Sequence, residues 1–145
     1  MTKARKIVLA IALFCILCAV LVLFVFVSLH GYFDRGQFEI EKAEWVSSTQ
    51  VAVVAKRSDH EALSGDQYFV VIGDHLFSSP ELRHAYYAHG VIFRAGSSCL
   101  TVRWENPHHL IVTCEDRSIE PDQIAVQQHQ SGDIAISYVD IPNKN

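Results

Sequence analysis

The longest apolar stretch of the chain runs from Ile7 to Leu29 and contains no charged residue. As an α-helix rising about 1.5 Å per residue, this stretch can cross a hydrocarbon core roughly 30 Å thick. A cleaved signal peptide has a shorter apolar region of about 7–15 residues and a small-x-small cleavage site, which this region lacks. The pattern predicts one uncleaved transmembrane helix over residues 7–29, preceded by a basic tail over residues 1–6.

After a short polar and aromatic tether over residues 30–37, apolar and polar positions alternate with a period of two along residues 38–145. This period is typical of strands that bury one face, and turn residues separate the stretches. We therefore expect mostly strands joined as hairpins. The expected strands cover residues 38–45, 50–56, 67–72, 91–94, 99–104, 109–114, 124–128 and 134–138.

One segment of the soluble region carries helix signals instead. Ser79 is suited to an N-cap, Pro80 to the first helical position, and Glu81 to the first turn, while Gly90 can end the helix. We expect residues 80–89 to form the only helix of this region. The predicted fold is an N-terminal transmembrane helix followed by a small α+β or mostly-β domain of antiparallel hairpins.

The basic residues before the predicted helix indicate its orientation across the membrane. Lys3, Arg5 and Lys6 precede the apolar run, and basic flanks favour the cytoplasmic side. We expect a single-pass protein of the cytoplasmic (inner) membrane, with its N-terminus in the cytoplasm and its C-terminal domain outside. Residues 31–145 carry nine lysine and arginine residues against sixteen aspartate and glutamate residues, a formal net charge of −7. This acidic balance disfavours nucleic acid as a partner.

The soluble region has two cysteines, Cys99 and Cys114, on either side of a predicted hairpin turn at Asn106-Pro107. With an even loop, Cys99 falls opposite Cys114, within reach of a disulfide. With an odd loop, apolar residues of the two strands pair instead, with Cys114 opposite Leu100, and Cys99 is expected on the other face. Hydrophobic pairing favours the second register and an oxidising compartment favours the disulfide, so both stay open.

No residue pattern identifies catalytic chemistry. The GxSxG, HExxH and paired CxxC motifs and the glycine-rich phosphate loops are all missing, and we expect no catalytic, cofactor-binding or metal-binding residues. The aromatic residues Tyr86, Tyr87, Phe93 and Trp104 are expected in the core. Histidines are numerous, but their spacing suits no metal site. They are His30, His60, His75, His84, His89, His108, His109 and His129.

Two segments, residues 45–54 (WVSSTQVAVV) and residues 102–112 (VRWENPHHLIV), carry a family resemblance. Together they resemble a bacterial family of small single-pass membrane-anchored β-rich domains of unknown function. In that family a Ser-Pro-Asp-Gly-like turn precedes a strand, and a Trp-x-Asn turn joins a later hairpin. The Pro-Asp-Gly is missing here. The resemblance implies an anchor and a β-rich domain, and it assigns no catalytic residue.

The function expected from these observations is that of an interaction or accessory domain outside the membrane. Its partner would be another envelope protein, bound through an exposed sheet edge or through the region of Pro80 to Gly90. One alternative is an envelope sensor module for a small ligand or metal, suggested by the histidines. Another alternative is an envelope hydrolase.

Overall fold

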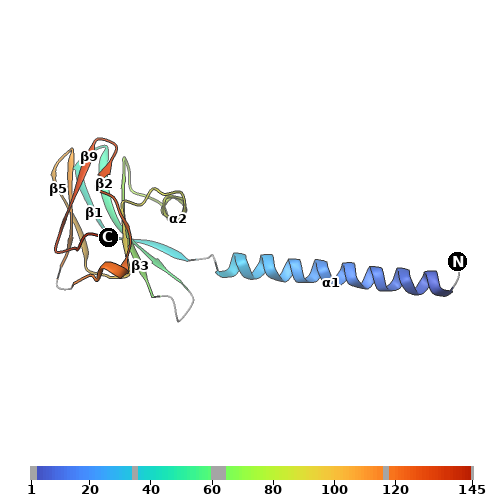
Figure 1. The fold of residues 1–145 in the computed structure, drawn as a ribbon. Coiled ribbons are helices and arrows are strands. Elements are labelled where there is room, and N and C mark those ends of the chain that lie inside the picture. Colours follow the sequence, from blue (N-terminus) through green and yellow to red (C-terminus); the bar gives the residue numbers. More distant parts are fainter. Residues whose placement is uncertain (1–2, 34–35, 60–64, 116–117, 145) are drawn as a thin grey trace. The chain divides into compact units, whose positions relative to one another are not determined.

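The computed structural model of the protein describes residues 3–33, 36–59, 65–115 and 118–144. The chain divides into two compact units, Met1–Arg35 and Gly36–Asn145. The first unit is the helix α1, Lys3–Phe33, and the second is a β-rich domain (Figure 1). Because the units are separate, each is described by itself.

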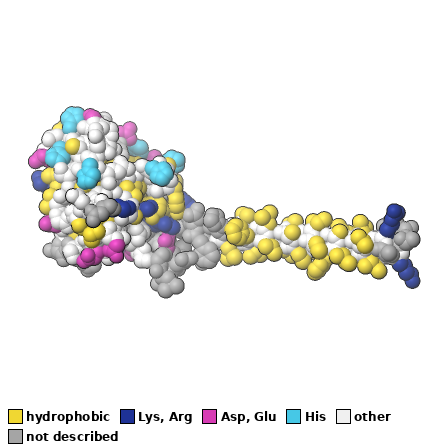
Figure 2. Space-filling model, viewed as in Figure 1, with side chains coloured by type: hydrophobic (Ala, Val, Ile, Leu, Met, Phe, Trp, Pro, Cys, Tyr) yellow, Lys and Arg dark blue, Asp and Glu magenta, His cyan; other side chains and the backbone are white. Residues whose placement is uncertain are grey.

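The segment Ile7–Leu29 of α1 is long and apolar enough to cross a membrane, and none of it is buried within the protein. Hydrophobic side chains cover its surface and basic side chains stand at its beginning (Figure 2). Lys3 and Arg5 are exposed, whereas the Lys6 side chain lies outside the described residues. The helix continues through Phe33, so the first four residues of the tether predicted from residue 30 are helical. An apolar surface of this size needs a covering, which a bilayer would provide.

The domain contains two sheets (Figure 1). The larger sheet has the strand order β1-β2-β3-β4-β7, and the smaller has the order β5-β6-β9-β8. A short helix, α2 (Ser79–Tyr87), and a 3-10 turn, η1 (Pro121–Gln123), complete the domain. The strands are β1 (Gln37–Ser47), β2 (Gln50–Ser58), β3 (Gln67–Gly73), β4 (Phe93–Ala95), β5 (Leu100–Asn106), β6 (His109–Cys114), β7 (Ile124–Gln127), β8 (Gln130–Ser131) and β9 (Ile134–Val139).

Two apolar clusters hold these layers together. Val54 and Val70 of the larger sheet pack with residues of the smaller sheet such as Leu110. The opposite face of the larger sheet, including Phe69, packs with Leu82 of α2. Both faces of β2 are therefore covered, and its five residues from position 51 to position 55 are all buried. A continuous apolar run suits such a doubly covered strand.

The predicted fold class is confirmed: an apolar N-terminal helix precedes a mostly-β domain with antiparallel sheets and one short α-helix. Three details differ. The strand β8 was not predicted, and the pairing of β6 with β9 is parallel rather than part of a hairpin. Residues Pro121–Gln123 (Pro-Asp-Gln) add a 3-10 turn, which has Glu120 as its N-cap residue and a Pro at its first position.

The ends of α2 also differ from the prediction. Ser78 rather than Ser79 is the N-cap residue, and Glu81 accepts hydrogen bonds from the Ser78 backbone nitrogen (2.7 Å) and hydroxyl (2.6 Å). The helix ends at Tyr87, and His89 adopts the left-handed conformation (φ 63°) that sequence patterns assign more often to glycine. The adjacent Gly90 donates its N–H to the Ala85 carbonyl at 2.9 Å.

Candidate functional site

Cys99 and Cys114 are joined by a disulfide, with their Cα atoms 4.8 Å apart. The hairpin has the register in which apolar residues pair, with Leu100 opposite Cys114 and Val102 opposite Val112. The sequence predicted that in this register Cys99 would point to the opposite face from Cys114. That prediction is wrong, because the two residues are bonded. Cys99 precedes the first residue of β5 and lies in a turn, so it does not follow the alternation of the strand. Both sulfur atoms lie within the core between the sheets.

The histidines are dispersed over the domain. Within the described residues, no three His, Cys, Asp or Glu side chains gather as a metal site would require. His75 contacts Asp74 and Glu81, and His108 contacts Asp133 (2.9 Å). The side chain of His30 and all of His60 lie outside the described residues.

His75 connects the loop before α2 to the first turn of the helix. Its Nδ1 lies 2.5 Å from an Asp74 oxygen and its Nε2 lies 3.0 Å from a Glu81 oxygen. The hydrogen bond to Asp74, followed by the one to Glu81, raises the pKa of His75 above 6.5. Hydrogen bonds from Ser78, followed by the one to His75, lower the pKa of Glu81 to about 2. The network therefore favours a protonated imidazole beside two carboxylates.

The shifted pKa values of this network predict a window of stability. The contribution of protonated His75 to the free energy of unfolding is fully present below pH 6.5. It is lost as the pH rises through the higher pKa of His75 in the folded domain. The contribution of Glu81 is complete above pH 4.5 and is lost as the pH falls through about 2. Both contributions are therefore fully present between pH 4.5 and pH 6.5. NMR titration should give His75 a midpoint above 6.5, and the Glu81→Gln variant should lower it.

A matched control for this titration is the Glu105→Gln variant, because Glu105 contacts His109 and not His75. It should leave the His75 midpoint unchanged. A midpoint at or below 6.5 in the unmodified chain would show that the hydrogen bonds to Asp74 and Glu81 do not persist in solution.

A second polar chain crosses the outer face of the smaller sheet. His109 Nε2 lies 2.7 Å from Ser137 Oγ, and His109 Nδ1 lies 2.5 Å from Glu105 Oε2. A hydroxyl, an imidazole and a carboxylate in this order have the connectivity of a hydrolase triad. Sequence analysis missed it because Ser137 reaches His109 through the parallel pairing of β6 with β9, which no local pattern indicates.

The surroundings of Ser137 differ from those of a catalytic serine. Ser137 lies within β9, where it pairs with Ile111, and not on a sharp turn beside a helix N-terminus. A triad needs free N–H donors that stabilise the oxyanion of the intermediate, and N–H groups within a ladder are engaged by the neighbouring strand. The chain formed by Ser137, His109 and Glu105 therefore fits a structural link between β5, β6 and β9.

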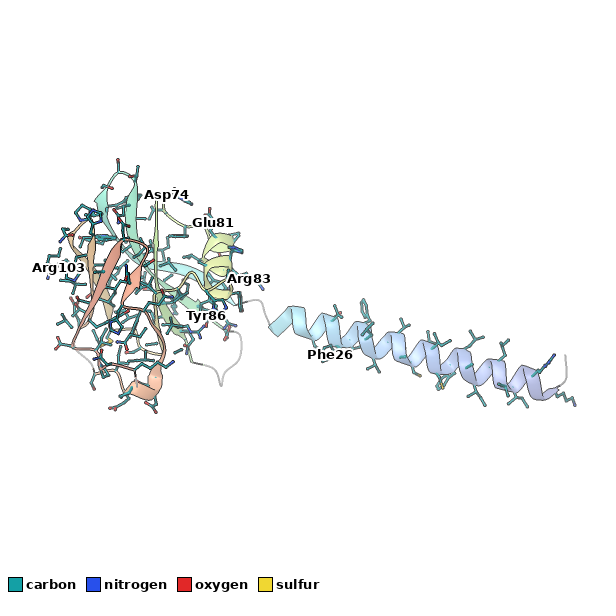
Figure 3. All side chains as sticks on the ribbon, turned by 45° about the horizontal axis from the view of Figure 1, so that its top comes forward. Phe26, Asp74, Glu81, Arg83, Tyr86 and Arg103 are labelled. Carbon is teal, nitrogen blue, oxygen red and sulfur yellow. A yellow bond between two sulfur atoms is a disulfide. The ribbon has the colours of Figure 1, made fainter. Side chains whose placement is uncertain are left out.

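Arginine and tyrosine side chains form a cluster where α2 covers the larger sheet. The Cζ atoms of Arg57 and Arg94 lie 5.1 and 4.9 Å from the centre of the Tyr86 ring. Arg57 also pairs with Asp59 at 2.8 Å. Tyr86 projects from the end of α2 (Figure 3), and its ring contacts Phe38 and Phe69. Tyr86 is therefore a half-buried core residue, as predicted, with two guanidinium groups beside its ring. Tyr87 was also expected in the core, but it is 46% exposed, so that prediction is wrong.

The strand β1 forms one edge of the larger sheet, and β2 is its neighbour in that sheet. Three residues of β1 pair with buried residues of β2 that belong to the apolar cluster beneath α2. The pairs are Ile40 with Ala55, Ala43 with Val53, and Trp45 with Val51. The three β1 residues face the same side but are exposed, with 37% of Ile40 and 44% of Trp45 accessible. We call Ile40, Ala43 and Trp45 the β1 strip.

Comparison of the chain with protein families, with characterised proteins and with solved structures finds no significant match. The resemblance to a bacterial family of membrane-anchored domains therefore stays a prediction. Any functional interpretation has to depend on the surfaces and cavities of the chain itself.

Proposed function

We propose that this protein is an interaction or accessory domain that α1 anchors in the cytoplasmic membrane, with the β-rich domain outside. The apolar surface of Ile7–Leu29 supports the anchor. The basic residues Lys3, Arg5 and Lys6 support an N-terminus in the cytoplasm, because basic flanks are retained on that side. The disulfide between Cys99 and Cys114 suits an oxidising compartment. The proposed partner is another envelope protein.

The observation that carries the proposal is the β1 strip. Each of its residues stands beside a fully buried residue of β2, so the strip extends the hydrophobic core to the surface. Exposed apolar side chains that continue a core are typical of surfaces that a partner covers. Trp45 is well suited to contact a partner, because tryptophan is enriched among the residues that contribute most of the binding free energy of an interface.

The backbone and charges of β1 favour one kind of partner, an extended basic segment. The outer edge of β1 can accept an added strand. Trp104 Nε1 already donates to the Glu44 carbonyl at 2.9 Å, so the free part of the edge is its N-terminal half. A register shift between Ile40 and Lys42 bends this half and limits the length of an added strand. Three glutamates, Glu39, Glu41 and Glu44, against the single Lys42 make the strand acidic.

Site-specific photo-crosslinking of the full chain in its native membrane tests this proposal. We expect a photoreactive residue at Ile40 to form one discrete adduct with a different protein, through an extended basic segment that mass spectrometry can identify. The combined Glu39→Gln, Glu41→Gln and Glu44→Gln variant should weaken this adduct, because charge complementarity increases the rate of association.

The matched control places the same residue at Val139, which is 45% exposed and lies on β9. It should form no such adduct. Equal adducts at both positions, an adduct that is insensitive to the glutamate substitutions, or a product formed by two copies of this chain would each contradict the proposal.

A further inference from the structure

A cavity of about 240 Å³ lies where the end of α2 meets β4 and β7. Arg94 and Val126 contribute from the two strands, which pair at these residues. Tyr86, Tyr87 and His89 contribute from the end of α2 and the turn that follows it. The cavity lies on the side of the larger sheet that α2 covers, because Arg94 pairs with Phe69, which faces α2.

Arg94 brings to this cavity a positive charge that no carboxylate of the described residues pairs with. Its side chain is half-buried, and none of the described carboxylates lies within 4.0 Å of it. Its Nε is buried and has no hydrogen-bond partner among the described residues. The Nε of the neighbouring Arg57 is likewise buried without a hydrogen-bond partner in the described part of the chain, but Arg57 has a counterion in Asp59 at 2.8 Å. A partly desolvated cation without a counterion is costly, and an anion in the cavity would offset that cost.

The walls of the cavity indicate which groups, besides an anionic one, a ligand would carry. Tyr86 presents its ring 4.9 Å from the Arg94 guanidinium carbon, and Val91 and Val126 are apolar. A ligand with a planar or apolar body would contact these groups. The cavity volume of about 240 Å³ lies below the usual range of about 300–1,000 Å³ for ligand sites, which restricts the ligand to a small molecule.

The charge and geometry of Arg94 favour a carboxylate over other anions. A guanidinium presents two parallel N–H groups that match the two oxygens of a carboxylate. A single guanidinium balances one negative charge, whereas a phosphate monoester carries more than one near neutral pH. The site therefore suits a monoanion.

Hydrogen bonds fix Gln128 in one wall of the cavity. Gln128 donates from its backbone nitrogen to the Ile92 carbonyl at 2.8 Å and from Nε2 to the Val91 carbonyl at 3.0 Å. The Tyr138 hydroxyl donates to the Gln128 carbonyl at 2.5 Å. These bonds fix Gln128 against Val91 and Ile92, so this wall would need little rearrangement on binding.

We propose that the cavity between Tyr86, Arg94 and Val126 binds a small organic monocarboxylate with an aromatic or apolar body. This site is separate from the β1 strip and does not depend on the proposed protein partner. It would make the domain responsive to a metabolite as well as to a protein.

Binding can be tested by NMR on the full, isotopically labelled chain in lipid nanodiscs, with benzoate as the probe. We expect saturable shifts at the amides of Tyr87, His89 and Arg94. Benzyl alcohol has the same ring without the charge, and inorganic phosphate has charge without the ring. Both should bind more weakly than benzoate. Equal binding of benzyl alcohol, tighter binding of phosphate, or the absence of saturable shifts would overturn the proposal.

Variants test the role of Arg94 directly. Arg94→Gln should weaken benzoate binding by about ten- to hundredfold, the usual range for a lost hydrogen bond to a charged group. The matched control is Arg103→Gln, since Arg103 is exposed, belongs to β5 of the smaller sheet and lies across the domain from Tyr86 (Figure 3). A spectrum of the Arg94→Gln variant that keeps its dispersion shows that the domain is folded.

If Arg94→Gln does not fold, Val126→Phe provides a second test, because it fills the cavity and leaves the charge in place. It should abolish benzoate binding while the thermal unfolding transition remains. Unchanged binding in either folded variant would place benzoate elsewhere and overturn the proposal.

Discussion

Replacing Cys99 and Cys114 together by alanine should lower the free energy of unfolding of the domain by about 3 kcal/mol, which is the loop-entropy expectation for a bond that closes about fifteen residues. The two cysteines are 15 residues apart in the chain. The disulfide restricts the unfolded chain, and its removal adds unfolded conformations while also deleting two buried sulfur atoms from the core. The expected loss of stability therefore arises mainly in the unfolded state.

Urea unfolding of the full chain in lipid nanodiscs measures this effect. Tryptophan fluorescence reports on the domain alone, because both tryptophans, Trp45 and Trp104, lie outside α1. The matched control is the double Cys15→Ala and Cys18→Ala variant, whose substitutions lie on the exposed surface of α1. It should keep the midpoint of the unmodified chain. A midpoint that also stays unchanged after removal of Cys99 and Cys114 would contradict the prediction.

Phe69→Ala should destabilise the domain by about 3–5 kcal/mol, the range for truncating a buried phenylalanine. Phe69 is fully buried beneath α2, and its ring packs edge-on against Phe38 at 6.1 Å and Tyr86 at 5.1 Å. The loss combines the hydrophobic free energy of the ring with a cavity between α2 and the larger sheet. The same urea titration measures it.

The control for this core variant is Val139→Ala, because 45% of Val139 is exposed. It should change the free energy of unfolding by less than about 0.5 kcal/mol, as surface substitutions usually do. A loss below about 1 kcal/mol for Phe69→Ala would indicate that α2 does not pack tightly on the sheet.

Local patterns predicted most of the elements. The apolar run at Ile7–Leu29 and the alternation along β1 and β6 depend on neighbouring residues, so the sequence reveals them directly. An even or an odd loop left two possible registers for the hairpin between β5 and β6, and apolar pairing favoured the one that the structure has. The disulfide could not be decided, because it depends on where the turn ends and the strand begins at Cys99.

The candidate sites depend on long-range pairing and could not be predicted. Arg94 and Val126 meet because β4 pairs with β7, about thirty residues later in the chain. Tyr86 joins them because α2 packs over the same face of the sheet. Nothing in the residues around Arg94 indicates that no described carboxylate would pair with it. An exposed sheet edge was expected as the interaction surface. β1 is an edge strand of the larger sheet, but its role as an interaction surface stays a prediction.

The parallel pairing of β6 with β9 also constrains the order in which the domain can form. Chains are made from the N-terminus, so Cys99 and Cys114 are available to each other before Ile134–Val139 has been synthesised. Until β9 arrives, β6 has a free edge, and free edges of incomplete sheets promote aggregation. An early disulfide would hold β5 against β6 during this interval. When β9 is synthesised, it would then pair with β6 in a hairpin that the disulfide had already fixed.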